Sequence, residues 1–204
     1  GTITYAPNTQ KIHQANGSSY RYDPDVNFQG TTDFARMVSY TSVGLVQAVM
    51  DHSGSTSKGY DYFYDDDHHR SIEFRMIGQG GGASSNSDTH YFYDGVTPFF
   101  EEDNDEPPTG GMLITWRHYI NTPEGIEEIV TVKNDATNTR TDLALTRDHL
   151  GSTVVAGGDV PAEMLGYDEW GRRRNADGSS NPGATSVNTD RGFTGHEMMD
   201  TNTL

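Results

Sequence analysis

The sequence predicts an all-β protein built from consecutive antiparallel hairpins. Short alternating segments rich in tyrosine, threonine and valine recur along the chain, and these residues favour strands. Clusters of glycine, asparagine, aspartate and serine separate the segments, and these residues favour turns. No segment with helical periodicity alternates with the strands, so a doubly wound α/β fold is not expected.

The composition limits what the chain can do. Its 204 residues carry a formal net charge of −16, and only 32% of them are hydrophobic. Such a chain buries little apolar surface to offset its ordering entropy, so we expect it to depend on neighbouring chain or on a partner. The acidic balance argues against binding nucleic-acid phosphates or anionic membranes. Cysteine is absent and no apolar run reaches transmembrane length, so we expect no disulfide and no membrane span.

Alternation and turn residues define the expected strands in order. Asn16-Gly17 is the strongest short hairpin signal. Between residues 33 and 50 a helix is the alternative to two strands, but Thr41, Ser42 and Gly44 disfavour a helix interior. The expected strands are 2–5, 11–14, 19–22, 37–41, 45–50, 60–64, 71–77, 91–93, 112–120, 126–133, 142–146, 152–156 and 164–167.

Two segments are expected to be loops. Residues 78–89 are rich in glycine, serine and asparagine, which is typical of a flexible connection. Residues 101–110 hold an acidic run that ends at Pro107 and Pro108, and we expect a charged loop there.

A tyrosine–aspartate dipeptide recurs through the chain. Tyrosine packs well on one face of a pleated sheet, and aspartate accepts backbone N–H groups in the turn that follows. We therefore expect each copy to end a strand and begin a turn. The copies are Tyr22-Asp23, Tyr60-Asp61, Tyr64-Asp65, Tyr93-Asp94 and Tyr167-Asp168.

Four further segments follow one another in the second half. They are Arg117-His118-Tyr119; Asp148-His149-Leu150-Gly151-Ser152; Tyr167-Asp168 with Gly171-Arg172; and Arg191 and Phe193 with Gly195-His196-Glu197. These segments resemble the motifs of the Rhs core, and the tyrosine–aspartate copies resemble the YD repeat. The chain is thus similar to Rhs/YD-repeat proteins, which include teneurins and the C components of insecticidal toxin complexes.

The resemblance implies hairpins of the YD-repeat type that form part of a spiralling β-shell. Residues 1–116 would be degenerate YD-repeat hairpins and residues 117–204 an Rhs core-like segment. The implied function is structural, namely to encapsulate or present a C-terminal toxin or effector in competition between bacteria. The implied partners are the rest of the shell, the enclosed toxin and a secretion machinery. The protein would be secreted or held at the cell surface, although no signal peptide is visible.

In this family a self-cleavage segment and the toxin follow the core, and here they would lie beyond Leu204. We therefore expect no catalytic residue and no cofactor within the chain. Asp148, His149 and Ser152 include the residue types of a catalytic triad, but they are crowded on one turn. We expect Asp148 to cap this turn, Gly151 to adopt a positive φ, and His149 to pack or hydrogen-bond across strands.

Metal binding is a minor alternative. Asp65, Asp66, Asp67 and His68 offer carboxylates suited to Ca²⁺ and an imidazole suited to Zn²⁺. Their spacing is not that of an EF-hand loop, so a solvated turn is the preferred interpretation. The acids of 101–106 are a second calcium candidate, for which a charged loop is preferred.

Two other functions stay open. The aromatic strands 60–64 and 91–93 would present rings to a glycan in a cell-surface module that binds carbohydrate or protein. The clustered aspartates and glutamates would serve a hydrolase if two carboxylates stood at a defined separation, which a sequence does not give.

Overall fold

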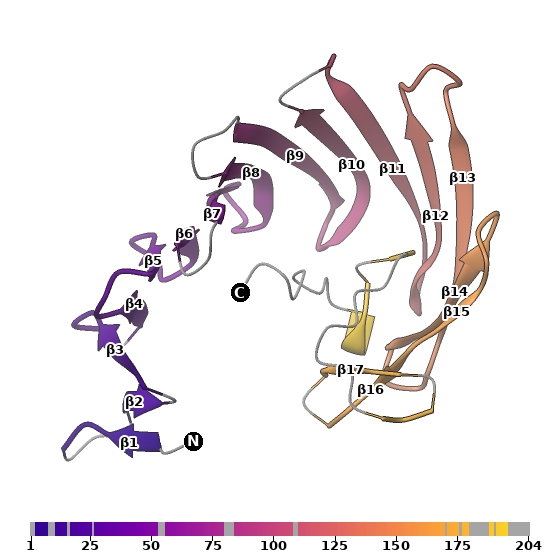
Figure 1. The fold of residues 1–204 in the computed structure, drawn as a ribbon. Coiled ribbons are helices and arrows are strands. Elements are labelled where there is room, and N and C mark those ends of the chain that lie inside the picture. The colour runs from indigo at the N-terminus through magenta and orange to yellow at the C-terminus, as the bar shows by residue number, and fades with distance from the viewer. Residues whose placement is uncertain are drawn as a thin grey trace. The chain divides into compact units, whose positions relative to one another are not determined.

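The computed structural model describes residues 3–7, 11–15, 17–25, 27–52, 56–79, 84–107, 110–169, 171–175, 177–179, 188–189 and 191–195. In these residues, fifteen strands belong to one sheet in which each strand is hydrogen-bonded to the strands next to it in the chain. Figure 1 labels the strands in chain order. The pairs with a resolved register are antiparallel. The prediction of an all-β fold made of consecutive hairpins is therefore confirmed.

The strands vary in length from short pairs to long central hairpins, and a separate hairpin follows them. The sheet contains β1 Ile3–Tyr5, β2 Ile12–Ala15, β3 Ser18–Tyr22, β4 Phe28–Thr31, β5 Arg36–Tyr40, β6 Val46–Asp51, β7 Thr56–Tyr64, β8 Arg70–Gln79, β9 Ser84–Asp94, β10 Thr97–Glu106, β11 Leu113–Thr122, β12 Gly125–Lys133, β13 Arg140–Arg147, β14 Thr153–Gly158 and β15 Glu163–Met164. The last elements are the hairpin of β16 Gly166–Tyr167 with β17 Arg173–Arg174, and the 3₁₀ turn η1 Phe193–Gly195.

Where a helix was the alternative, between residues 33 and 50, the structure has the strand pair β5 and β6. The helix is therefore ruled out here, and Gly44 at φ 84° supplies the turn between the two strands. No helix in the described part of the chain is long and apolar enough to cross a membrane.

The chain forms two compact units. The first contains Gly1–Thr89 and Asp105–Met112, and the second contains His90–Asn104 and Leu113–Leu204. In the first unit, the core consists of Val49, Tyr60 and Tyr62, against which Val38, Val46 and Tyr64 pack. In the second unit, a larger core is formed by Tyr119, Ile126, Ile129, Leu143, Leu145, Ala156 and Leu165.

The expectation of a loop over 78–89 is wrong for the described residues, because β8 continues to Gln79 and β9 begins at Ser84. Residues 80–83 lie outside the described residues. Serine and asparagine have low strand propensity, but pairing within the sheet overrides it. The hydroxyl of Ser87 on β9 accepts a hydrogen bond from Arg75 Nε on β8 at 2.9 Å. This side-chain contact connects the polar strand β9 to β8.

The expectation of an acidic loop over 101–110 is wrong as far as Glu106, because the acids form the second half of β10. Basic and polar groups of other strands neutralise them. Glu102 accepts a hydrogen bond from Trp116 Nε1 at 2.9 Å, and Asp105 lies 3.3 Å from the guanidinium of Arg75. A run of like charges forms a strand here because its partners carry the opposite charge.

One five-residue turn recurs between strands. Its first residue donates its backbone N–H to the carbonyl of the fifth and accepts the amide of the fifth on its side chain. Where the fourth residue is described, it has a positive φ of 66° to 84° and donates its N–H to the first carbonyl. The turns with this pattern are Asp23–Asn27, Thr41–Leu45, Asp65–His69, Asp148–Ser152 and Asp168–Arg172.

A tyrosine clamp connects successive turns. The hydroxyl of Tyr40 donates to the Phe28 carbonyl at 2.8 Å, and that of Tyr64 donates to the Val46 carbonyl at 2.6 Å. In both cases the tyrosine precedes one turn and the acceptor directly follows the previous turn. The pair Tyr167 and Thr153 repeats this arrangement at 2.8 Å. The expectation that aspartate begins the turn after the tyrosine is confirmed at Asp23, Asp65 and Asp168. It is wrong at Asp61, which lies inside β7 and pairs with Ala48 on β6.

Candidate functional site

Segments far apart in the sequence meet around residues 191–195, in the second unit. The backbone N–H of Thr153 donates to the Gly192 carbonyl at 3.1 Å, and the N–H of Thr194 donates to Ser152 Oγ at 3.1 Å. Ser152 and Thr153 have no exposed surface. We call this contact region the motif junction; it comprises Glu101, Arg117, Tyr119, Ser152, Thr153, Tyr167, Gly171 and Arg191–Gly195.

An aromatic contact forms one side of the junction. The ring of Phe193 lies 5.8 Å from that of Tyr167, centroid to centroid. Gly171 has a φ of +80°, and a Cβ at this position would stand only 2.9 Å from the Phe193 ring. Glycine is therefore required twice over, for the turn and for the space that Phe193 occupies.

A buried ion pair forms the other side. The guanidinium of Arg191 donates to Glu101 at 2.9 Å and lies 5.1 Å from the ring centroid of Tyr119. Arg191 is 7% exposed and Glu101 is 3% exposed. Arg117 adds a second guanidinium, 3.7 Å from Glu101 and 3.5 Å from Asp103. The Glu101 carboxylate is thus compensated by two arginines, and Arg191 links the segment after residue 188 to β10 and β11.

The structure brings together about half of the motif residues singled out from the sequence. The residues that belong to the junction are Arg117, Tyr119, Ser152, Tyr167, Gly171, Arg191, Phe193 and Gly195. Other motif residues do not join. His118, His149, Leu150 and Arg172 are exposed, and His196 and Glu197 lie outside the described residues.

Glu101 and Thr153 are central to the junction but were not among the motif residues named from the sequence, and Glu101 was considered only as part of a calcium candidate. Thr153 follows the Asp148–Ser152 turn, so the turn motif itself pointed to it. Glu101 sits in the run that was interpreted as a loop. The signal that could have found it is the match between buried arginines in the motifs and an acid in an alternating strand, since a buried guanidinium requires a carboxylate partner.

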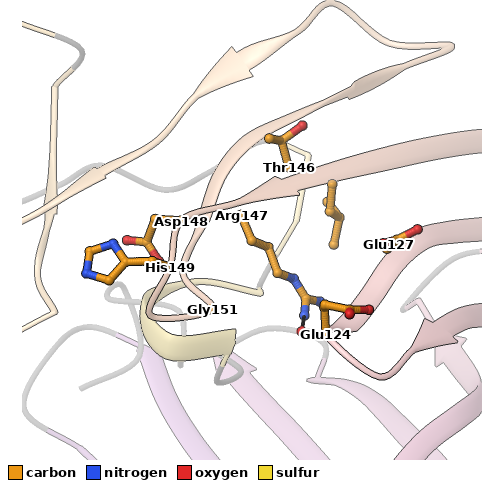
Figure 2. A pocket seen from close by; sticks show the side chains of 8 residues that line it. Glu124, Glu127, Thr146, Arg147, Asp148, His149 and Gly151 are labelled. Carbon is orange, nitrogen blue, oxygen red and sulfur yellow. Dashed lines mark hydrogen bonds between the residues drawn. The ribbon is translucent and has the colours of Figure 1, made fainter.

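An open cavity of about 540 Å³ lies next to the Asp148–Ser152 turn (Figure 2). Arg147 donates to the carbonyls of Glu124, at 2.9 Å, and of Ile126. A Cβ at Gly125 would collide with this guanidinium, so glycine makes room for it. In Figure 2 the Arg147 side chain extends towards Glu124, whereas His149 points away from it. The cavity is lined by Glu124, Glu127, Leu145, Thr146, Arg147, Asp148, His149 and Gly151.

Two polar side chains at this cavity, Arg147 and Asp148, bind the backbone. Asp148 accepts the amides of Leu150 and Ser152, and the Ser152 N–H lowers the pKa of that carboxyl. Burial lowers the pKa of Arg147. Ser152 Oγ accepts the N–H of Thr194 and is buried, whereas His149 is exposed on the turn. Asp148, His149 and Ser152 are therefore not arranged as a nucleophile with its base. As expected, Asp148 caps the turn and Gly151 has a positive φ of 84°, whereas the expected packing of His149 across strands is not seen, because its side chain is exposed.

The acidic turn at residues 65–68 is one of the five repeated turns. Asp65 Oδ1 accepts the amides of Asp67 and His69 at 3.0 and 2.8 Å, and His68 occupies the positive-φ position at 66°. The Asp65 carboxylate therefore faces its own backbone. Among the residues that the structure describes, no group of three or more His, Asp or Glu side chains is placed to hold a metal ion.

Comparison of the chain with known proteins gives no matching family model and no matching curated protein. The likeness to Rhs/YD-repeat proteins therefore rests on the residues of this chain.

Proposed function

We propose that the chain is a structural segment of the β-shell of an Rhs/YD-repeat protein. The observation that carries the proposal is the motif junction. Segments that resemble the Rhs core motifs, spread over residues 117–195, make direct contacts with one another in a buried region. Motifs that serve packing are expected to meet in this way, with their polar groups paired internally.

The repeated turn with its tyrosine clamp supports the same proposal. Each clamp connects one hairpin to the preceding one through a hydrogen bond to the main chain, so the hairpins form a continuous series. Such a series extends by adding units, as in other repeat proteins, and suits the wall of a container. The YD-repeat type and the spiral course of the wall are part of this proposal.

In the proposed role the segment helps to enclose or present a C-terminal toxin or effector of an exported bacterial protein. Its partners are the remainder of the shell, the enclosed domain and a secretion machinery. Chemistry would belong to the enclosed domain, while this segment contributes stable walls.

The alternatives receive less support from the geometry. Tyr60 and Tyr62 are 6% exposed and stack on each other with ring centroids 6.4 Å apart, so their faces are not available to a glycan. Tyr91 is also buried. The carboxylates of β10 pair with arginines and Trp116, which leaves them poorly suited to general acid–base work in a hydrolase.

Electron microscopy of the natural full-length protein tests the proposal. The expected result is a closed hollow particle with density inside it. The same particle is expected to protect the C-terminal domain from added protease, whereas this domain alone is digested. An open or solid particle, or a C-terminal domain that is digested as fast inside the protein as alone, would contradict the proposed function.

A further inference from the structure

A row of methionine and glycine residues crosses five strands of the first unit. Gly30 on β4 pairs with Met37 on β5, and Met37 pairs with Met50 on β6. Met50 pairs with Gly59 on β7, which pairs with Met76 on β8. Residues that pair directly across strands project from the same face of a sheet. Three thioether side chains therefore leave one face of the sheet side by side.

The glycine in the row leaves room for the thioethers to converge. A Cβ at Gly59 would lie 3.5 Å from Met76 Cε, so the end of the Met76 side chain lies over Gly59. β6 and β8 are two strand spacings apart, roughly 10 Å, and methionine has three rotatable side-chain bonds. The sulfurs of Met50 and Met76 can therefore approach each other above Gly59. Met37 is the direct neighbour of Met50, at a Cβ separation of about 5 Å.

An imidazole stands beside this row. His52 Nδ1 lies 2.9 Å from Ser57 Oγ. His52 is two residues along from Met50, and Ser57 is two residues from Gly59, so both project from the thioether face. When Nδ1–H donates to the serine hydroxyl, Nε2 carries the free lone pair. In metal sites, a hydrogen bond of this kind from the other ring nitrogen orients the histidine ligand.

We infer that Met37, Met50, Met76 and His52 form a binding site for a soft monovalent cation of the Cu⁺ class. Thioether sulfur favours Cu⁺ over hard cations, whereas zinc sites in proteins are built from thiolate, imidazole and carboxylate ligands. The chain has no cysteine that would compete. Met50 is 36% exposed and Met76 is 38% exposed, so a dissolved ion can reach the sulfurs without unfolding. The site is independent of the proposed shell function.

Titration of the complete chain with Ag⁺ in chloride-free buffer tests the site. Ag⁺ has the same coordination preferences as Cu⁺ and does not change oxidation state. With methionine methyl groups labelled by ¹³C, we expect saturation at one Ag⁺ per chain. The methyl signals of Met37, Met50 and Met76 should shift, while those of Met112 and Met164 should not.

Leucine variants provide a second readout, because leucine keeps most of the volume of methionine and lacks the sulfur. Met50→Leu is expected to weaken Ag⁺ binding about tenfold or more, or about 1.4 kcal/mol. Met164→Leu, at a position 68% exposed, is the matched control and should bind as the native chain does. Circular dichroism verifies that both variants fold.

Several results would overturn the inference. They are the absence of saturable binding, shifts at Met112 and Met164 as large as those of the three expected residues, and a folded Met50→Leu variant that binds like the native chain. Displacement of Ag⁺ by equimolar Zn²⁺ would also contradict it, because zinc binds thiolate, imidazole and carboxylate ligands rather than thioethers.

Discussion

The buried ion pair between Arg191 and Glu101 is the contact with the largest expected energetic consequence. A buried carboxylate that loses its partner keeps the cost of its desolvation and gains nothing in return. Arg117 lies farther from Glu101, at 3.7 Å, and is more exposed, so it compensates only in part. The junction therefore depends on Arg191 more than on its neighbours.

Replacement of Arg191 by methionine is expected to lower the free energy of unfolding by about 3–5 kcal/mol, since it removes the closer partner of the buried Glu101 carboxylate and leaves the more distant Arg117. Urea denaturation followed by tryptophan fluorescence measures the change. Arg140→Met is the control, because Arg140 pairs with Asp142 at the surface and should leave the midpoint unchanged. The double variant with Glu101→Gln should recover part of the loss. A native midpoint for Arg191→Met would refute the importance of the pair.

Deletion of the Tyr64 hydroxyl tests the tyrosine clamp. Tyr64→Phe removes the donor to the Val46 carbonyl and should cost about 0.5–1.5 kcal/mol, with the ring left in place. Tyr5→Phe removes the hydroxyl of a tyrosine that is 59% exposed and should have no measurable effect. Equal effects of the two substitutions in denaturant titrations would show that the hydrogen bond contributes nothing.

At the scale of elements, local pattern was enough wherever strand and turn signals agreed. Local signals predicted the alternation of β7 and the aspartate turns at Asp65 and Asp148, because each depends only on residues that are neighbours in the sequence. β10 was not, because its strand state depends on arginines that are distant in sequence. Propensity describes what a segment prefers alone, and partners on other strands decided the outcome here.

The motif junction shows the same division between local and distant causes. The motifs themselves were visible in the sequence, and Gly171 was expected to matter as part of a turn. Its second role, making room for Phe193, depends on a contact across more than twenty residues of chain. The turn at Gly171 can be predicted from neighbouring residues, whereas its contact with Phe193 is known only from the fold.

Two glycines at equivalent turn positions separate these two roles. Gly44 has a φ of 84° and nothing within 4 Å of its would-be Cβ, whereas Gly171 has a φ of 80° and faces the Phe193 ring at 2.9 Å. Gly44→Ala should cost about 1–2 kcal/mol from the left-handed backbone alone. Gly171→Ala should cost about 1–3 kcal/mol more, from overpacking. Thermal or urea denaturation compares them, and equal losses would contradict the packing role of Gly171.

At the scale of the whole molecule, two electrostatic effects oppose each other as the pH falls. The net charge of −16 repels itself, and partial protonation relieves this repulsion. The turn aspartates act in the other direction, because their carboxylates stabilise the turns most when they are ionised and accept the backbone N–H groups. Hydrogen bonds lower the pKa of Asp135, chiefly those from Thr139, and of Asp148, chiefly that from the Ser152 amide.

The sign of the pH dependence follows from these lowered values. A carboxyl whose pKa is lower in the folded state contributes stability that is fully present above its unfolded pKa of about 3.9 and is lost as the pH falls through the folded pKa. We therefore expect the urea midpoint to decline once the pH drops below about 4. In Asp148→Asn the amide oxygen still accepts the Leu150 and Ser152 N–H groups without a proton to gain, so its decline should be shallower. A midpoint that rises from pH 5 to pH 3 would mean that relief of charge repulsion outweighs the turn aspartates. An Asp148→Asn profile parallel to the native one would mean that ionisation of Asp148 does not contribute to the pH dependence.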